Sequence, residues 1–235
     1  MAIALYILVE GDTEERFANQ VLVPHLVGVG VCAYVSKVVT RGRRGNHEHQ
    51  GGGRTYGKWK NDLTTWIKQQ HHRSDVWFTT MLDFYGLSEF SDGFPAYAEH
   101  AACTDAYQRV ENLEAAWARD VGFHRFVPYL QLHEFEALVL VDTTVLKARF
   151  LDNEKQVDQL AAAIAGTRQP PELINDRRET SPSHRIASFV PAYARQKADA
   201  GSSAARTIGL ARLRGACPHF DRWISRLEQL DKSAL

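Results

Sequence analysis

The sequence predicts an α/β fold, in which a mostly parallel sheet of about four strands is flanked by helices and followed by a C-terminal helical extension. Short apolar runs that end at polar residues have the length and composition of buried strands. Amphipathic segments between them have the period of helices that cross over between parallel strands. Beyond residue 150 the pattern is helical, so residues 1–150 are predicted to form the α/β domain and residues 151–235 a helical extension packed on it.

The first strand is predicted at residues 3–9, where a continuous apolar run stops at a glutamate and a glycine. A helix is predicted at residues 13–27, because Thr13 can cap it, two glutamates favour its first turn, and its apolar residues form one stripe. Pro24 lies inside this stripe and is expected to kink or shorten the helix, since proline has no N–H to donate to the preceding turn.

The remaining elements follow from the same two periodicities. Residues 31–40 alternate and are rich in β-branched side chains, which favours a second strand. Residues 41–55 carry five glycines, which excludes regular structure there. The other predicted elements are a helix at 56–70, a strand at 76–82, a loop at 84–95, a helix at 104–119, a strand at 126–131, and helices near 153–165, 184–196, 204–214 and 219–231.

Composition and charge limit the class of protein. The chain has 235 residues, 44% of them hydrophobic, which is enough for a folded core. No apolar run reaches the roughly 20 residues that a membrane-spanning helix needs, and an acid at position 10 interrupts the N-terminal apolar run, so we expect a cytoplasmic protein. Three widely spaced cysteines support neither a zinc motif nor a disulfide framework. The formal net charge is zero, so any nucleic-acid site must be local.

One segment of the chain is locally basic. Residues 41–60 contain six lysines and arginines against few acids. Guanidinium groups and the exposed N–H groups of a glycine-rich loop bind phosphate oxygens. The predicted phosphate-binding residues are Arg41, Arg43, Arg44, Arg54 and Lys58. The alternative is a solvent-exposed loop without a ligand, and the sequence leaves that choice open.

Carboxylates stand where predicted strands end. Glu10 follows the first strand, Glu14 lies in the first turn of the next helix, and Asp83 follows the third strand. Because the carboxyl ends of parallel strands meet at one edge of a sheet, we expect these side chains to lie close together. Carboxylate oxygens are preferred ligands of Mg²⁺ and Mn²⁺, so the pattern predicts a divalent-metal site for chemistry on phosphates. The alternatives are an acidic helix start for the glutamates and an Asx cap for Asp83.

A second polar cluster stands at the start of the apolar segment 132–141. His133, Glu134 and Glu136 are costly to bury there unless they bind a ligand, form pairs or lie at an edge. His133 can serve as a general acid, a general base or a ligand. His133 and Glu136 also have the spacing of neighbours on one helix face, so a structural hydrogen bond is the alternative. Glu134 and Glu136 cannot share a helix face, so at most one of them is expected to reach a metal.

These motifs together resemble a known family. The runs Val9–Glu14, Thr80–Leu87, Gln131–Leu138 and Cys217–Phe220 are similar to those of a bacterial family catalogued as domain of unknown function 4276 and viewed as Toprim-like. The strand ending Val-Glu-Gly also resembles the Toprim domain of topoisomerases, primases and overcoming-lysogenization-defect nucleases. The resemblance implies a Toprim-like, Rossmann-like fold and metal-dependent chemistry on phosphodiesters.

The resemblance also implies roles for single residues. Glu10 becomes a general acid/base or metal ligand, and Glu14 a second group that faces the metal. Toprim domains usually end the third strand in Asp-x-Asp, whereas here Asp83 is followed by Tyr85 at the second position. An acid of segment 132–141 is the expected replacement for the missing ligand. The expected metal ligands are Glu10, Glu14, Asp83 and Glu134, for Mg²⁺ or Mn²⁺, and the expected catalytic groups are Glu10, His133 and Glu136.

The leading hypothesis is therefore an Mg²⁺- or Mn²⁺-dependent nuclease, a hydrolase that acts on DNA or RNA. The resemblance further implies an effector of anti-phage defence that is controlled by an ATPase of AAA or ABC type encoded nearby. One alternative is a non-catalytic Toprim-like sensor or docking module for that ATPase. A weaker alternative is a small-nucleotide phosphohydrolase, which a closed acidic cavity would favour over an open groove rimmed by the basic segment.

Overall fold

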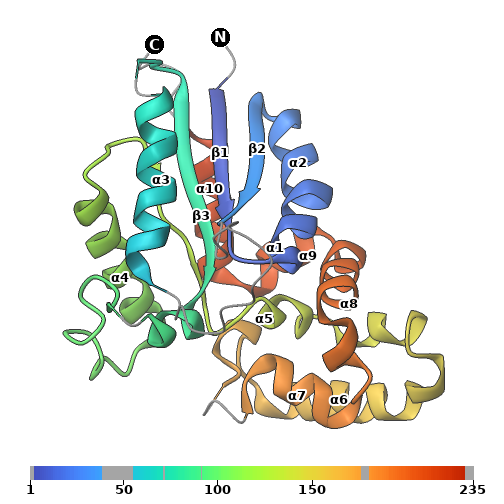
Figure 1. Cartoon of the computed structure of the whole chain (residues 1–235). Coiled ribbons are helices and arrows are strands. Elements are labelled where there is room, and N and C mark those ends of the chain that lie inside the picture. The colour runs from blue at the N-terminus through green and yellow to red at the C-terminus, as the bar shows by residue number, and fades with distance from the viewer. Residues whose placement is uncertain (1–2, 39–54, 71, 91, 176–179, 231–235) are drawn as a thin grey trace, which may run out of the picture.

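The computed structural model describes residues 3–38, 55–70, 72–90, 92–175 and 180–230. They contain a parallel sheet in the order β2-β1-β3-β4, with a fifth strand that also pairs with β3 (Figure 1). The strands are β1 (Ile3–Val9), β2 (Val31–Lys37), β3 (Val76–Asp83), β4 (Phe126–Val127) and β5 (Leu130–Gln131). The α/β class with a parallel sheet and C-terminal helices is confirmed.

Helices cover both faces of the sheet, as the alternation of side chains along β1 shows. Ile3, Leu5 and Ile7 share one apolar core with α1, α2 and α10, whereas Ala4 and Leu8 share the other with α3 and α4. Both faces are therefore dry, which explains why the first strand is continuously apolar. The helices are α1 (Asp12–Phe17), α2 (Val23–Gly28), α3 (Tyr56–Gln70), α4 (Ala106–Val121), α5 (Glu136–Val139), α6 (Glu154–Thr167), α7 (Pro182–Phe189), α8 (Tyr193–Ile208), α9 (Leu210–Ala216) and α10 (Pro218–Glu228).

The first helical region accommodates Pro24 without a break. A π-helical turn at Ala18–Leu22 joins α1 to α2, and the N–H of Val23 donates to the carbonyl of Ala18, five residues back. Pro24 then lies at the start of α2. The wider π turn already interrupts the α-helical hydrogen-bond pattern there, so the missing N–H of the proline removes no further bond. The predicted single helix at 13–27 thus spans Asp12 to Gly28 in three segments, because the π turn absorbs the proline.

The C-terminal helices belong to the same core as β1. Val157 of α6, Ile186 of α7 and Tyr193 of α8 are fully buried in the cluster that contains the odd-numbered residues of β1. α8 runs against α1, and a Cβ atom at Gly201 would lie 3.0 Å from Tyr193 Oη and 3.4 Å from Thr13 Cγ2. A glycine at this position therefore permits the close approach of α8 to α1.

Several predicted boundaries differ for local reasons. The predicted strand at 126–131 is two short strands, because Pro128 between them cannot donate to a sheet ladder. The predicted helix at 184–196 is divided between α7 and α8 at Pro191. Gly209, with φ of 84°, ends α8 and starts α9 inside the predicted helix at 204–214. Within the described residues, no helix combines the length and apolar character needed to span a membrane.

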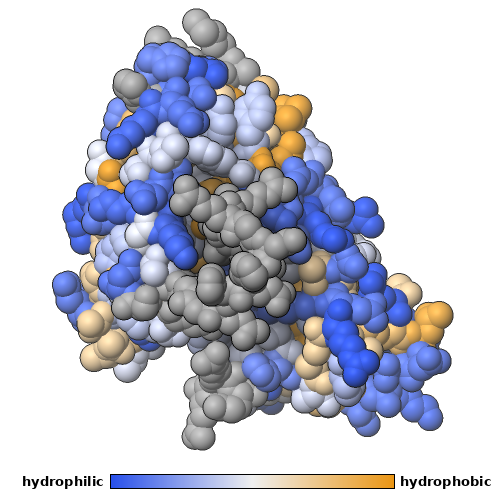
Figure 2. All heavy atoms as spheres, viewed as in Figure 1, coloured by the Kyte–Doolittle hydropathy of each residue, from blue (hydrophilic) through white to orange (hydrophobic). Residues whose placement is uncertain are grey.

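The side of the molecule seen in Figure 1 is mostly hydrophilic over its described surface (Figure 2). An apolar patch lies over α2 (Figure 2). Val27 of this helix is 55% exposed, and Val29, just after the helix, is 36% exposed. Single exposed apolar residues are common on protein surfaces, so this patch by itself indicates no ligand.

Candidate active site

A cavity of about 560 Å³ lies where β1 and β3 end, between η2 (Phe84–Glu89) and α4 on one side and α7 and α8 on the other. Its position at the carboxyl ends of parallel strands is the usual position of a ligand site in such sheets. The acidic, basic and imidazole side chains that line it are Glu10, Glu14, Asp83, Arg109, Glu134, His184 and Lys197. Four acids thus share one cavity with two permanent cations.

The parallel pairing of β1 and β3 brings Glu10 and Asp83 together. The backbone N–H of Asp83 donates to Glu10 Oε2 at 3.2 Å, which ties the first glutamate to the end of the neighbouring strand. The Asp83 Oδ1 atom is buried and has no hydrogen-bond partner among the described residues. Burial and the negative charges of Glu14 and Glu10 raise the pKa of Asp83 well above its usual range.

Glu14 reaches the cavity from the first turn of α1. Its Oε2 atom accepts a hydrogen bond of 3.0 Å from the N–H of Gly11, and only 6% of the residue is exposed. A Cβ atom at position 11 would lie 3.0 Å from that oxygen, so the glycine keeps room for the carboxylate. Burial, opposed by the hydrogen bond and assisted by Glu10 and Glu136, raises the pKa of Glu14 to about 7.

Glu134 and Glu136 both contact Lys197 of α8, but in different surroundings. Glu134 lines the cavity and accepts hydrogen bonds from Ser183 N at 2.7 Å and Ser183 Oγ at 2.9 Å, with Lys197 Nζ at 3.2 Å. Glu136 is fully buried, with Lys197 Nζ 3.1 Å from Oε2 and Tyr193 Oη 3.0 Å from Oε1. Glu136 is therefore behind the cavity wall, whereas Glu134 is in it.

The pKa values of the two glutamates shift in opposite directions. Burial acts to raise the pKa of Glu134, but Lys197 and Ser183 hold it below its usual range. Burial raises the pKa of Glu136 in spite of Lys197 and Tyr193. Burial acts to lower the pKa of Lys197, yet Glu136 and Glu134 keep it above its usual range, so Lys197 carries a positive charge. No sequence pattern singles out Lys197, because a lysine in a helix is normally a solvated residue.

His133 has a backbone conformation that is rare for a non-glycine residue. Its φ is 62°, and its carbonyl accepts from Tyr85 N at 2.9 Å while its Nδ1 atom lies 3.4 Å from Asn175 Nδ2. Burial lowers the pKa of His133 to about 4. The side chain does not line the cavity, and α5 begins only at Glu136, so the two do not share a helix face.

The predicted phosphate-binding segment lies almost entirely outside the described residues. Arg41, Arg43, Arg44 and Arg54 all fall there. Lys58 is described, in the first turn of α3, and is exposed without lining the cavity. Two cations that sequence reasoning did not select, Arg109 and Lys197, line the cavity instead.

The family model described as "Domain of unknown function (DUF4276)" matches residues 9–228. The chain belongs to this family. Among solved structures, the DUF4276 chain is similar to the C-terminal region of the Burkholderia pseudomallei OLD protein, with 16% identity and a TM-score of 0.45 over 95% of this chain and 96% of that one. It is also similar to the C-terminal region of the Xanthomonas campestris pv. campestris OLD protein, with 14% identity and a TM-score of 0.38 over 94% of this chain and 96% of that one. Comparison with curated proteins gave no match. Similarity this distant leaves activity to be argued from the site.

The donor set of this DUF4276 cavity fits a divalent ion. Glu10, Glu14 and Asp83 supply hard oxygen ligands, and the buried Oδ1 atom of Asp83 has an unused lone pair. Burial and mutual repulsion raise the pKa values of Glu14 and Asp83, and a cation among the carboxylates would relieve the repulsion. Within the described part of the chain, no three His, Cys, Asp or Glu side chains are grouped closely enough to hold an ion as they stand. Binding would therefore need these carboxylates to change rotamer.

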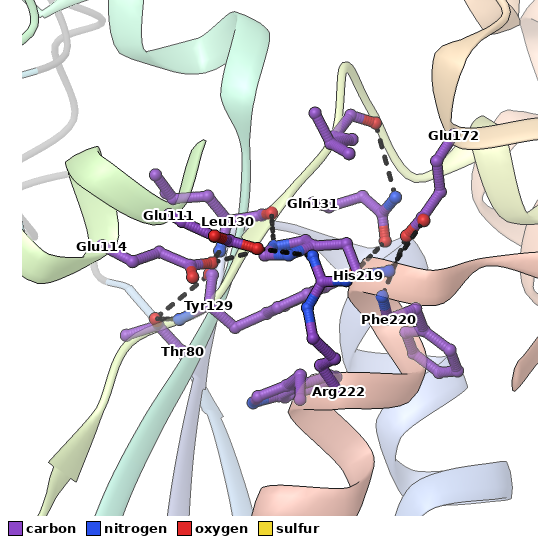
Figure 3. Close-up of polar contacts among 12 residues, drawn as sticks. Thr80, Glu111, Glu114, Tyr129, Leu130, Gln131, Glu172, His219, Phe220 and Arg222 are labelled. Carbon is purple, nitrogen blue, oxygen red and sulfur yellow. Dashed lines mark hydrogen bonds and ion pairs between the residues drawn. The ribbon is translucent and has the colours of Figure 1, made fainter. Parts of the chain in front are cut away.

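A polar network behind the cavity holds the strand that precedes His133 and Glu134 (Figure 3). Glu114 Oε1 accepts from Leu130 N at 2.7 Å and lies 3.0 Å from His219 Nε2. His219 Nε2 is also 3.2 Å from the Leu130 carbonyl, and its ring stacks on Tyr129 with centroids 5.1 Å apart. The Cys217–Phe220 motif of the family thus anchors β5 from the start of α10.

Glu172 completes this network at the start of α10. Its carboxylate accepts from His219 N and from Phe220 N, each at 2.9 Å (Figure 3). A carboxylate at a helix N-terminus satisfies otherwise unpaired N–H groups and interacts favourably with the helix dipole. Glu172 is fully buried, so these bonds are the reason that a carboxylate is tolerated there.

Proposed function

We propose that this DUF4276 protein is a metal-dependent phosphodiesterase of Toprim type that cleaves DNA or RNA. The observation that carries the proposal is the convergence of Glu10, Glu14 and Asp83 on one cavity that also contains Lys197. Carboxylates for a cation and an ammonium group for an anion are the complementary parts of a phosphodiester site. Membership of the family supports the proposal through the motifs that the chain shares with it.

The proposed ligands of Mg²⁺ or Mn²⁺ are Glu10, Glu14 and Asp83. Such an ion supplies a polarised phosphoryl oxygen and a water of lowered pKa. The ammonium group of Lys197 binds a non-bridging phosphate oxygen and offsets the negative charge that develops there. Glu134, held by Ser183, fixes the position of that ammonium group at the cavity wall.

Proton transfer in this proposal falls first to Glu10, which the backbone N–H of Asp83 orients toward the end of β3. Glu136 acts through Lys197, because its carboxylate contacts the ammonium group from behind the wall. His133 stays neutral near pH 7, since its pKa is about 4, and its carbonyl positions the backbone of Tyr85. An anti-phage role under the control of an ATPase partner remains part of the proposal through the family resemblance.

The test is cleavage of plasmid, single-stranded DNA and total RNA in Mg²⁺ or Mn²⁺, with and without the neighbouring ATPase. Glu10→Gln and Asp83→Asn are each expected to lower the rate by at least about 100-fold, as loss of an acid–base group or a metal ligand does. Glu154→Gln is the control, because it removes the charge of a carboxylate that is exposed and outside the cavity. Wild-type rates in both site variants would show that the site is assigned wrongly.

A second candidate is a non-catalytic docking module for the ATPase. Tyr85 favours it, because this residue stands at the second acidic position of the Toprim pattern and lines the cavity. In that case divalent-ion affinity, measured by titration calorimetry, would not change in Glu10→Gln. A third candidate, a small-nucleotide phosphohydrolase, is favoured by the cavity volume of about 560 Å³ and predicts that nucleoside triphosphates are hydrolysed faster than polymers.

A further inference from the structure

Arg109 is a cation of the cavity that the proposed chemistry does not use. It lies in the first turns of α4 and lines the same cavity as the carboxylates. Its Cζ atom lies 4.9 Å from the centroid of the Phe84 ring and 5.4 Å from that of the Tyr97 ring. Contacts of a guanidinium with two ring faces fix its position without using its N–H groups.

The guanidinium N–H groups of Arg109 are left without protein partners. Among the described residues the Arg109 guanidinium forms no ion pair and no hydrogen bond, and its Nε atom is buried. By contrast, Arg214 contacts Asp221 and Glu228, as arginines in this protein commonly contact carboxylates. A buried N–H without an acceptor is destabilising, and at a cavity a bound ligand can supply the acceptor.

The position of Arg109 sets what that ligand is. Phe84, which holds the guanidinium, directly follows Asp83 in the chain, so the cation lies beside the acidic end of β3. A ligand in the cavity meets the carboxylates and, beside them, a guanidinium fork. A polynucleotide backbone fits both, because one phosphate can be shared with a cation at the carboxylates while the next accepts a bidentate pair of hydrogen bonds from arginine.

The form of the nucleic acid follows from burial. Glu14 is 6% exposed and Asp83 has a buried oxygen, so a phosphate must enter the cavity to approach them. A cavity of about 560 Å³ suits a single strand, because its backbone is flexible and its bases stack on aromatic side chains. Tyr85 and Tyr97 line the cavity with Arg109, and the Tyr97 ring is in contact with its guanidinium.

We propose that Arg109 binds the backbone phosphate next to the scissile one, and that the site takes single-stranded polynucleotide. The inference rests on the proposed phosphodiesterase site and names its substrate class. Phe84 and Tyr97 position the guanidinium, and the carboxylates of the cavity repel any anion that arrives without a cation. Binding is therefore expected to need both Arg109 and a divalent ion.

The test measures binding of a fluorescent 12-nucleotide oligothymidylate by anisotropy in Ca²⁺, over a series of salt concentrations. Arg109→Gln is expected to weaken binding about 10-fold and to lower the salt slope by about 0.7, the value for one phosphate contact on a single strand. Arg109→Lys keeps the charge but not the fork, so its affinity should lie between the two. Arg119→Gln is the control, because Arg119 lies on α4 and is exposed outside the cavity.

The outcomes separate this inference from the proposed function. Equal affinities for wild type and Arg109→Gln, in a variant whose thermal unfolding is unchanged, would overturn the inference even if wild type cleaves DNA. Arg109-dependent binding without cleavage by wild type would support single-strand binding at Arg109 and refute the phosphodiesterase. Two competition results would overturn the substrate class. One is a duplex that displaces the fluorescent oligothymidylate as well as an unlabelled single strand does. The other is thymidine monophosphate that displaces it as well as the single strand at the same phosphate concentration.

Discussion

Replacing Glu14 with glutamine is expected to stabilise the metal-free protein above neutral pH. Burial, with help from the charges of Glu10 and Glu136, raises the pKa of Glu14 from 4.5 to about 7. The folded state therefore binds this proton more tightly than the unfolded state does. The resulting stabilisation is present below about pH 4.5 and is lost as the pH rises through about 7. A difference of about 2.5 between the two pKa values corresponds to about 3 kcal/mol.

The assay is urea unfolding in EDTA from about pH 4 to about pH 8. Wild type is expected to lose about 3 kcal/mol of unfolding free energy relative to Glu14→Gln across this range, with the two proteins most alike at the acid end. The amide oxygen of glutamine can still accept a hydrogen bond from Gly11 N, as Glu14 Oε2 does at 3.0 Å in the wild type. In the thermal midpoint the difference amounts to roughly 6–12 °C for a chain of this size.

Glu154→Gln is the control for this prediction, because it makes the same change in an exposed helix first turn. Its pH dependence should follow that of wild type. The linkage argument would be refuted if Glu14→Gln and wild type lost stability in parallel from acid to alkaline pH. It would equally be refuted if the control gained as much stability as Glu14→Gln, since burial would then not be the cause.

Three further outcomes are expected. Glu172→Ala should lower the unfolding free energy by about 2–4 kcal/mol in urea titrations, because two buried N–H groups at the start of α10 lose their acceptor. Lys197→Met should cost about 2 kcal/mol, less than a fully buried pair because the lysine side chain is 40% exposed, and adding Glu136→Gln should recover part of it. Mg²⁺ should raise the thermal midpoint of wild type more at about pH 8 than at about pH 6, since ligands must lose protons, and Asp83→Asn should abolish the rise.

The acidic half of the candidate site could be predicted because it depends on strand ends. Glu10 and Asp83 each follow a continuously apolar run, and adjacent parallel strands deliver their last residues to one edge. The N–H of Asp83 donating to Glu10 is the direct result of that register. Glu14 could be predicted with them because its place on α1 is fixed within one helical turn of the strand.

The segment after β5 shows where local patterns were insufficient. His133 and Glu136 have helical spacing, but His133 has a positive φ and the helix starts three residues later, so the expected shared face is absent. The conformation at His133 is held by a hydrogen bond to Tyr85, 48 residues earlier, and by Asn175 beyond it. The residue pattern within the segment cannot predict hydrogen bonds to residues so far away in the chain.

The α/β class, the strands and the acids at their ends can be predicted from the amino-acid order alone, because they depend on periodicity and on the geometry of parallel pairing. Only the tertiary structure placed Arg109 and Lys197 at the cavity, since each comes from a helix whose packing is set by side chains far away in the chain. A lysine or arginine on a helix has the same local pattern whether it faces water or a cavity. The position of each side chain depends on its contact partner from another element, which is Glu136 for Lys197 and the Phe84 ring for Arg109. These contacts exist only after folding.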